Sequence, residues 1–428
     1  MTLRRIPPII WMFIGVLLFE FSSILSLSFS AANYIKMLGV SITIFAFFCA
    51  PKRPVPGAIK YASIVMVVII LLMVIRGSVI GNIPVGINGS AYEIIRHFLV
   101  YKHSAFAIMF PLVLLVDFND LELKYYKSLA IASSIISLFL LLYYKDYIFT
   151  TSIITGLSDL EVNGEYISIR ELSHSIFIGL GFILCIGFAY NYLHSKLALL
   201  IPITLLFYFI SQVMGGGRGG SVMSFGYLVL FFAIAYQSFN KDNKIGKRFI
   251  IIIMLCLSVC LIFYLYKKTD LFDYLLYRAF EGGEVGTGLK ESSREEFVDA
   301  FVSDFDNHPL CWLFGRGVNG AYRLDSGEMR SAMEWGYLWL ILKGGIVYFL
   351  AYIYLLIKPA ILGIFRSNNQ LSKSFAVLCI IQVLSLIPFG VPAVSTLFLL
   401  TWHGARLISD PQFRRLSDEE IDLMINSK

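Results

Sequence analysis

The most unusual local composition in the sequence surrounds a single arginine. Arg218 stands within GGGRGGS, residues 215–221, with five glycines around it. Glycines leave backbone N–H groups open to the close approach of an anion, and a guanidinium group can form two parallel hydrogen bonds with a phosphate. The segment is therefore a candidate phosphate-binding turn. The simpler alternative is a tight turn whose arginine extends its charge into water.

A second candidate is an arginine at the start of a predicted helix. The segment ESSREEFVDAFVSDF, residues 291–305, has phenylalanine and valine on one helical face, and Ser292 or Ser293 favours a capping box with a following glutamate. Arg294 falls in the first turn, where backbone N–H groups also point outward and could meet a phosphate with it. The helix itself could lie on the membrane surface or against the helix bundle. The simpler alternatives are a helix that only packs its own loop and an arginine that is only solvated.

Four more candidate residues follow this helix. They are His308 and three arginines that recur every seven residues, Arg316, Arg323 and Arg330. Guanidinium groups bind phosphates and imidazoles form hydrogen bonds with polar groups, so these four are candidates for substrate binding. For His308 the simpler alternative is a loop histidine with ordinary hydrogen bonds.

Glu334 stands at the end of the same segment, directly before an apolar run. A carboxylate at the edge of a membrane helix is a candidate functional residue, and it can act as a general base toward a hydroxyl group. The alternative is an interfacial ion pair with Arg330, one helical turn earlier. The sequence leaves both interpretations open.

The elements that must position these residues are membrane helices. Of the 428 residues, 57% are hydrophobic and only 15% are charged, which is too little polar surface for a water-soluble protein of this length. Composition therefore excludes a soluble enzyme, a nucleic-acid-binding protein and a disordered scaffold. Six cysteines, without CxxC or Cys/His spacing, predict neither a disulfide framework nor a zinc site.

Apolar runs recur from one end of the chain to the other and predict an all-α polytopic membrane protein. About 20 apolar residues are needed for each crossing. The first run follows Arg4 and Arg5 but is long enough to be a retained helix rather than a cleaved signal. The twelve predicted transmembrane helices lie near residues 8–29, 33–50, 61–75, 98–117, 128–144, 173–192, 196–214, 220–237, 249–266, 334–357, 374–389 and 392–405.

Four regions follow from this assignment. Residues 1–266 hold nine helices with short loops, residues 267–332 form one long loop, residues 333–405 hold three helices, and residues 406–428 form a tail. Connectors on one side carry 19 of the 35 lysines and arginines, whereas the opposite side has 8 outside the long loop. The positive-inside rule therefore predicts cytoplasmic termini and a periplasmic long loop. That loop has 12 acidic and 8 basic residues, so any anion site must depend on particular arginines.

The order of these motifs resembles a known family. A Gly-Arg-Gly turn between two helices precedes a long loop with Ser-Arg opening an amphipathic helix, then Asn-His-Pro-Leu and Phe-Gly-Arg-Gly, and a helix that begins Tyr-Leu and contains Gly-Gly-Ile. Over residues 170–360 this is similar to the O-antigen polymerase (Wzy-type) and O-antigen ligase superfamily. Ligases of that family usually carry a His-Asn pair before the Tyr-Leu, whereas Glu334 and Trp335 precede Tyr337 here, which favours a polymerase.

The resemblance also brings Arg170 into consideration. Some polymerases that this chain resembles have, in two periplasmic loops, an arginine and a glycine separated by ten residues. Arg170 and Gly181 have this spacing, and so do Arg316 and Gly327. The resemblance therefore implies that Arg170 binds substrate as well.

The resemblance further implies a GT-C-like fold in the bacterial inner membrane and metal-independent glycosyl transfer without a cofactor. The donor would be a glycan on polyprenyl diphosphate, and the acceptor a sugar hydroxyl of the next lipid-linked repeat unit of an O-antigen or related polysaccharide. Arg218 with Arg294 or Arg316 would stabilise the departing diphosphate, and Glu334 would accept the proton. The implied partners are the lipid bilayer, and a flippase and a chain-length regulator of the same pathway.

Two other functions stay open at the level of sequence. An O-antigen ligase would transfer the glycan to lipid A-core. A lipid-linked oligosaccharide flippase or other secondary transporter would need charged residues within the membrane and paired broken helices. The predicted spans contain Glu20, Lys36 and Lys343, and the two lysines could extend to the membrane surface.

Overall fold

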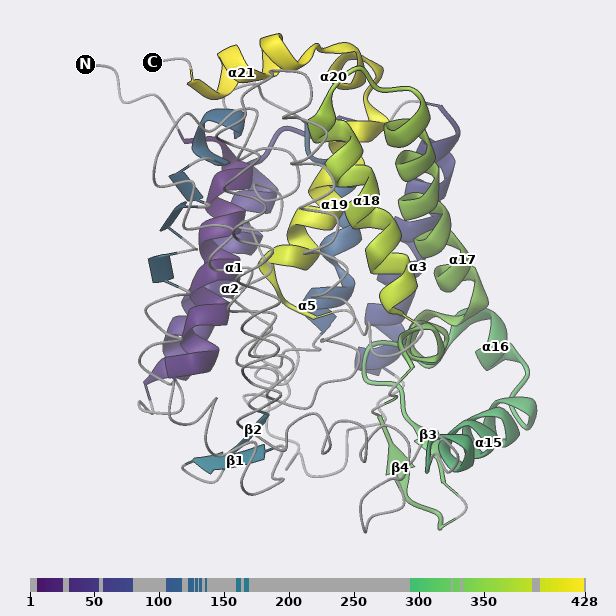
Figure 1. Ribbon diagram of the computed structural model, residues 1–428. Helices are drawn as coiled ribbons and strands as arrows, with labels where there is room; N and C mark the ends of the chain where they lie inside the picture. Colours follow the sequence, from purple (N-terminus) through teal and green to yellow (C-terminus); the bar gives the residue numbers. More distant parts are fainter. Residues whose placement is uncertain are drawn as a thin grey trace, which may run out of the picture. The chain divides into compact units, whose positions relative to one another are not determined.

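The chain divides into two compact units, Met1–Ser128 with Phe297–Lys428, and Leu129–Glu296. Helices predominate among the residues that can be described (Figure 1). The computed structural model describes residues 6–25, 31–53, 57–79, 105–117, 122–136 without 127, 130, 133 and 134, 159–162, 165–168, 293–386 without 325, 332 and 334, and 393–426.

Helices α1 (Pro8–Leu25) and α2 (Ala32–Cys49) pack against each other through small residues. Gly15 and Gly39 face each other so closely that a methyl group added to either would overlap the carbonyl oxygen of the other. The Thr43 hydroxyl, next to them, donates to the Gly39 carbonyl oxygen at 2.8 Å. Small residues of this kind let membrane helices approach through their backbones.

A second group of helices surrounds α17 (Gly336–Phe365), which contacts three of the others directly. Its core is aromatic, because the ring of Tyr352 packs edge-on against that of Trp402, with centroids 5.0 Å apart, and both side chains are fully buried. The other members of the group are α3 (Ala58–Val79), α18 (Gln370–Ser385), α19 (Thr396–Ser409), the short α5 (Ala105–Ile108) and the 3₁₀ helix η1 (Phe110–Leu115).

The prediction of a helical membrane protein is confirmed. Three described helices are long and apolar enough to cross a membrane, at Ala32–Cys49, Ile59–Arg76 and Gly336–Phe365. Shorter apolar helices cover Pro8–Ser22, Phe106–Leu115 and Gln370–Ser385. The predicted count of twelve spans depends largely on residues outside the described ranges and stays a prediction.

Two predicted spans differ from the observed helices around a proline. The span predicted at 334–357 continues to Phe365 with Pro359 inside the helix, a placement that membrane helices tolerate when neighbouring groups satisfy the backbone. The span predicted at 98–117 is, over its described residues, α5 followed by η1. Pro111 lies at the start of η1 and lacks an N–H group, which favours a change of helix type there.

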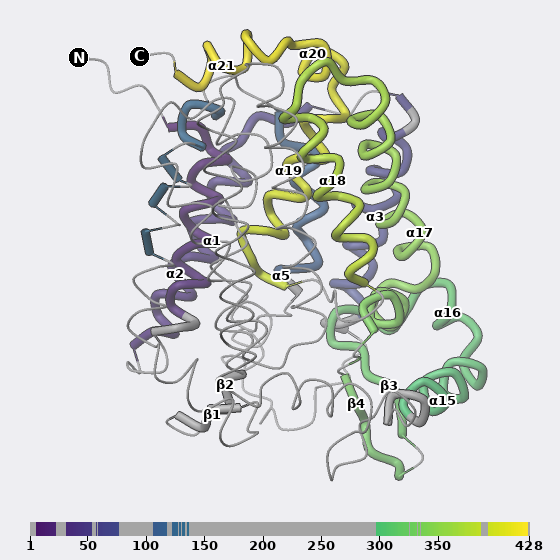
Figure 2. The backbone as a smooth tube through the Cα atoms, in the orientation of Figure 1, coloured from purple at the N-terminus to yellow at the C-terminus, as the bar shows by residue number. Residues whose placement is uncertain are grey.

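The C-terminal tail is folded onto the helices. Helix α19 continues past residue 405 to Ser409, and α20 (Pro411–Arg415) and α21 (Asp418–Asn426) follow it, as the yellow end of the tube in Figure 2 shows. The Asp418 carboxylate accepts a hydrogen bond from the Gln370 N–H group at 2.8 Å. This contact fixes the tail to the start of α18.

Two small antiparallel hairpins accompany the helices where the sequence predicted only loops. Strands β1 (Asp159–Val162) and β2 (Glu165–Ser168) pair in the second unit. Strands β3 (Tyr322–Arg323) and β4 (Met329–Arg330) pair in the first. The fold is therefore mostly, but not entirely, helical.

Candidate functional site

The predicted amphipathic helix is confirmed as α15 (Ser293–Asp306). Its Phe301 and Phe305 are fully buried and pack with Trp312 of α16 (Leu310–Phe314), at ring centroid distances of 5.7 and 5.3 Å. The helix therefore packs its own loop together, which was the simpler of the two expectations. We call residues 297–330, which comprise most of α15, all of α16 and the β3–β4 hairpin, the loop module.

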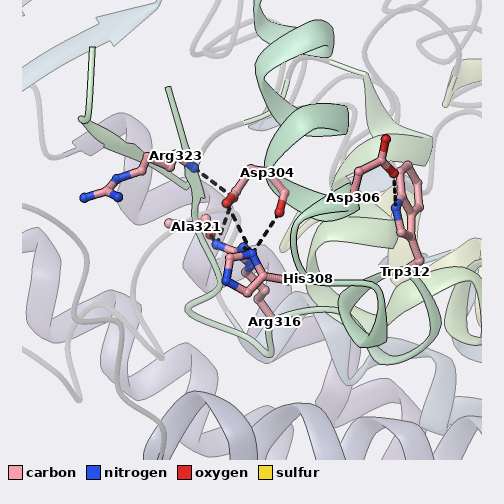
Figure 3. Close-up of polar contacts among 7 residues, drawn as sticks. All are labelled: Asp304, Asp306, His308, Trp312, Arg316, Ala321 and Arg323. Carbon is pink, nitrogen blue, oxygen red and sulfur yellow. Dashed lines mark hydrogen bonds and ion pairs between the residues drawn. The ribbon is translucent and has the colours of Figure 1, made fainter. Parts of the chain in front are cut away.

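Asp304 lies at the centre of the polar contacts in the loop module (Figure 3). Its Oδ2 accepts a hydrogen bond from Arg316 Nη1 at 2.9 Å and another from the Arg323 N–H group at 3.0 Å. The side chains of Asp304 and Arg316 are only 10% and 12% exposed, so this ion pair is largely shielded from water and stronger than a surface pair. One carboxylate thus holds both the glycine-flanked arginine and the first strand of the hairpin.

Arg316 has further partners that fix its guanidinium group. Nη1 also donates to the Ala321 carbonyl oxygen at 2.8 Å, and the group lies over the ring of Phe305, with Cζ 5.4 Å from the ring centroid. Its positive charge is compensated by Asp304. Any phosphate bound by Arg316 would have to compete with that carboxylate.

His308 lies beside this pair with its side chain 61% exposed. Its Nδ1 is 3.0 Å from the Asp304 carbonyl oxygen and 3.4 Å from Arg316 Nη2. A ring nitrogen cannot donate to the first and accept from the second at once, and the shorter contact favours the tautomer with a proton on Nδ1. In that tautomer Nε2 is an acceptor, available to a donor from outside the protein.

The other two arginines of the loop module lie on its hairpin. Arg323 is exposed, and Figure 3 shows its side chain extending away from Asp304. The guanidinium carbon of Arg330 lies 3.7 Å from the centroid of the Phe297 ring, which is a close cation–π contact. Of the arginines in the described residues of this loop, Arg323 is the one best placed to bind an anion from solution.

The loop module is joined to the membrane helices at a break in α17. The backbone is not helical at Gly345, where φ is +73°. Two carbonyl groups just before the break accept hydrogen bonds from the loop: Leu342 O from Arg316 N at 2.8 Å, and Lys343 O from Gly317 N at 2.9 Å. Loop backbone thus satisfies groups that an unbroken helix would pair internally.

Glycine is required on both sides of this junction. Gly315 has φ +63°, and a methyl group there would overlap the Lys343 carbonyl. A methyl group on Gly345 would overlap the Leu313 carbonyl. The ammonium group of Lys343, which is 4% exposed, donates to the Gly320 carbonyl oxygen at 2.7 Å.

A second membrane helix takes part in the same junction. The Val318 N–H group donates to the Met73 carbonyl oxygen of α3 at 3.2 Å. Met73 lies toward the end of α3 and Leu342 near the start of α17, so the loop module lies at one common end of two candidate spans.

The remaining predicted site residues cannot be placed in this arrangement. Arg170, Arg218 and Glu334 lie outside the described residues, and of Arg294 the structure describes only the backbone, in the first turn of α15. The described part of the chain contains no cluster of three or more His, Cys, Asp or Glu side chains that could hold a metal ion.

The structure adds two residues to the site. Asp304 is not a candidate from the sequence, and Lys343 is one there only as a charged residue within a predicted span; their partners lie 12 and 23 residues away. The sequence offers only weak signals for these two residues. Asp304 is an acidic residue that precedes the glycine-flanked Arg316, and Lys343 is a lysine directly before Gly-Gly inside an apolar run. Comparison with protein-family models, curated proteins and solved structures gives no match to the sequence.

Proposed function

We propose that this membrane protein polymerises lipid-linked oligosaccharide repeat units into an O-antigen or related surface polysaccharide. In this proposal the loop module faces the periplasm of a bacterium, both termini are cytoplasmic, and the chain lies in the inner membrane. The substrates are polyprenyl-diphosphate-linked glycans, and a flippase and a chain-length regulator of the same pathway are the expected partners.

The observation that carries the proposal is the attachment of a polar loop module to the common end of two candidate spans. Val318 bonds to α3 and Arg316 bonds to α17 through their backbones. A diphosphate on a polyprenyl chain lies at headgroup level, which is where membrane-spanning helices end. The loop module therefore holds its arginines and His308 near the depth at which such a substrate presents its phosphates and sugars.

The chemistry asked of these residues is a single displacement. The acceptor hydroxyl oxygen forms a bond to the anomeric carbon of the donor glycan, the bond from that carbon to the diphosphate oxygen breaks, and the diphosphate leaves with the electron pair. Arg218 with Arg294 stabilises the leaving charge and Glu334 takes the hydroxyl proton. Because Asp304 holds Arg316, we assign Arg316 to positioning the loop, and Arg323 to a contact with the bound substrate.

A secondary transporter of lipid-linked oligosaccharides is the second candidate, and two observations favour it. Helix α17 is broken at Gly345, as the helices of many transporters are at their substrate sites. Ionisable side chains are also buried among the membrane helices, including Glu20, Lys343 and His403. Intramembrane ionisable residues commonly serve transport.

The surface polysaccharide of a deletion strain separates these functions. A polymerase predicts that surface glycans are capped with a single repeat unit, and that long chains return when the intact gene is supplied. A transporter or a ligase predicts loss of all surface repeat units. In the second case, polymerised lipid-linked glycan retained on the outer side of the membrane would indicate a ligase, and single lipid-linked repeat units retained on the inner side would indicate a transporter.

A further inference from the structure

Three arginines lie together where the C-terminal tail folds onto the end of α17. Arg366 directly follows the last residue of that helix, and Arg414 and Arg415 are the last two residues of α20. The Asn368 N–H group donates to the Arg414 carbonyl oxygen at 2.9 Å, and the Asn368 side-chain amide donates to the Arg415 carbonyl oxygen at 3.3 Å. These bonds join the two segments that carry the arginines, which we call the arginine cluster.

A second asparagine fixes the same junction. Asn369 is fully buried, and its side-chain amide donates to the Phe413 carbonyl oxygen at 3.0 Å and to the Leu416 carbonyl oxygen at 3.1 Å. Its side-chain oxygen accepts from the Ser372 N–H group at 2.7 Å and so caps α18. The backbone on both sides of the two tail arginines is therefore held in place without a ligand, and such preorganisation lowers the cost of binding one.

The side chain of Arg414 is enclosed without a partner for all of its donors. Arg414 is only 9% exposed, and its Nε has no hydrogen-bond partner among the described residues. Arg366 and Arg415 are exposed, and in the described part of the chain neither side chain makes a hydrogen bond or an ion pair. A charged group that is shielded from water normally has a partner of opposite charge or a carbonyl oxygen. An anion bound from outside the chain would supply it.

The charges around Arg414 also favour a bound anion. Burial lowers the pKa of the Arg414 guanidinium group, and the like charges of Arg366 and Arg415 lower it further. The Asp410 carboxylate opposes them, but it also lies 3.9 Å from Arg406 Nη1 and is therefore shared. Like charges held this close repel each other, and a second anion would relieve that repulsion.

The carboxylates of α21 have other partners. Asp418 accepts from the Gln370 N–H group at 2.8 Å, and Glu420 accepts from the Ser417 N–H group at 2.7 Å. Both contacts are to backbone, and neither involves the arginine cluster. The acidic first turn of α21 therefore stabilises the tail rather than the guanidinium groups.

The arginine cluster lies at the depth of a lipid headgroup. From the break at Gly345 to Phe365, α17 advances by 20 residues. At 1.5 Å per residue this is about 30 Å, which is the hydrocarbon thickness of a bilayer. The loop module is attached just before the break, and Arg366 follows the other end. The cluster is therefore at the membrane surface opposite to the loop module.

Apolar side chains border the cluster on the outer surface of α17. Phe365 is 78% exposed, and Ile361, four residues earlier, is 49% exposed. Residues at this spacing lie on one face of a helix. A phosphate that carries acyl chains could therefore meet guanidinium groups at the helix end and hydrocarbon contacts along the helix.

We propose that Arg366, Arg414 and Arg415 bind a phosphate group at this end of α17. The guanidinium groups donate to the phosphate oxygens, and the phosphate supplies the negative charge that the cluster lacks. The exposed Phe365 and Ile361 favour the phosphate of an anionic lipid headgroup over a free phosphate ion. Glycosyl transfer as proposed above takes place at the opposite membrane surface, so this site does not depend on it.

The test measures binding to the full-length protein in a neutral detergent by isothermal titration calorimetry. The probes are dihexanoyl phosphatidic acid and inorganic phosphate, each corrected for its heat of mixing with detergent alone. We expect phosphatidic acid to bind, and Arg366→Gln to weaken its affinity by about tenfold or more, because hydrogen bonds to a charged group are lost. Arg414→Gln should act in the same direction. Arg366 is exposed, so Arg366→Gln remains a test even if Arg414→Gln does not fold.

The matched control is Arg53→Gln. Arg53 is also exposed, and it acts electrostatically on Arg406 near the end of α19, so it removes the same charge from the same end of the bundle. Affinity for phosphatidic acid should be unchanged in this variant. Equal losses in Arg53→Gln and Arg366→Gln, or no binding of either probe to the unchanged protein, would overturn the proposal.

A second variant separates the two sources of phosphate. If the site takes a lipid headgroup, inorganic phosphate should bind clearly more weakly than phosphatidic acid, and Phe365→Ala should weaken only the binding of phosphatidic acid. Equal affinities for the two probes, with no effect of Phe365→Ala, would assign the arginine cluster to a free phosphate ion instead.

Discussion

The ammonium group of Lys343 donates a hydrogen bond to the carbonyl oxygen of Gly320 at 2.7 Å, and it does so from inside an apolar helix. Together with the bonds from Arg316 N and Gly317 N to the carbonyl groups before the break, this contact makes the loop module part of the membrane bundle. A substitution in the first half of α17 should therefore alter the conformation of the loop module, which carries Arg323.

The first prediction concerns the break in α17. Gly345→Ala should lower the stability of the protein because a methyl group there overlaps the Leu313 carbonyl at a positive φ. The backbone strain alone is of order 1–3 kcal/mol. Gly327→Ala is the matched control, since Gly327 also has a positive φ but open space around it. Thermal unfolding in detergent should show a clearly larger loss for Gly345→Ala, and equal losses would contradict the proposed junction.

The second prediction concerns the carboxylate that holds Arg316. Asp304→Asn keeps the size of the side chain but leaves the largely buried guanidinium group without its counter-charge, at a cost of about 1–3 kcal/mol. We expect faster proteolysis within residues 297–330 and shorter polysaccharide chains. Asp306→Asn is the control, because Asp306 is exposed and accepts a hydrogen bond from Trp312 Nε1, the one contact drawn for it in Figure 3. Similar proteolysis of the two variants would count against a positioning role for Asp304.

The helical segments could be predicted from the sequence because their signals are local. An apolar run of sufficient length predicts a span, and the phenylalanine face of residues 291–305 predicts α15, which the structure confirms. The least accurate parts were helix ends near proline. The span predicted at 334–357 ends before Pro359, whereas α17 continues through this proline to Phe365.

The polar centre of the loop module could not be predicted in the same way. Asp304 is one of 12 acidic residues in the predicted loop, and nothing local shows that its partner would be Arg316 rather than water. The break at Gly345 could not be predicted from the sequence either, because Gly-Gly within an apolar run is compatible with close helix packing as well as with a break in the helix. Both features depend on contacts between residues distant in the sequence.

The third prediction concerns topology, on which the proposed function depends. A reporter fused near Gly286 should show periplasmic activity, and one fused at the C-terminus should show cytoplasmic activity, because the connectors predicted to lie on the same side as both termini carry most of the lysines and arginines. Fusions at both positions should be compared at equal protein abundance. The opposite pattern at either position would place the loop module on the wrong side of the membrane for lipid-linked donors.

The fourth prediction concerns Arg218, which lies outside the described residues. Arg218→Lys keeps a positive charge but loses the planar pair of donors that fits a phosphate. Chain extension should therefore be severely impaired while protein abundance is unchanged. Arg330→Lys is a useful comparison, because Arg330 packs on the ring of Phe297 and a lysine can keep a cation–π contact. Normal polymer length in Arg218→Lys would remove Arg218 from the mechanism.

The last prediction concerns Glu334 as the base that accepts the proton of the acceptor hydroxyl. Glu334→Gln preserves size and hydrogen bonding but removes the negative charge, so polymerisation should fall by roughly 10²-fold or more if the carboxylate is the base. An ion pair with Arg330 at the membrane edge would contribute only about 0–1 kcal/mol, and Arg330 already has a ring contact 3.7 Å away at Phe297. Arg330→Gln therefore serves as the comparison in the same polymer-length assay at matched expression. If Glu334→Gln and Arg330→Gln both give near-normal polymer, the base must be sought elsewhere in the loop, and the exposed His308, with Nε2 as an acceptor, is the next residue to replace.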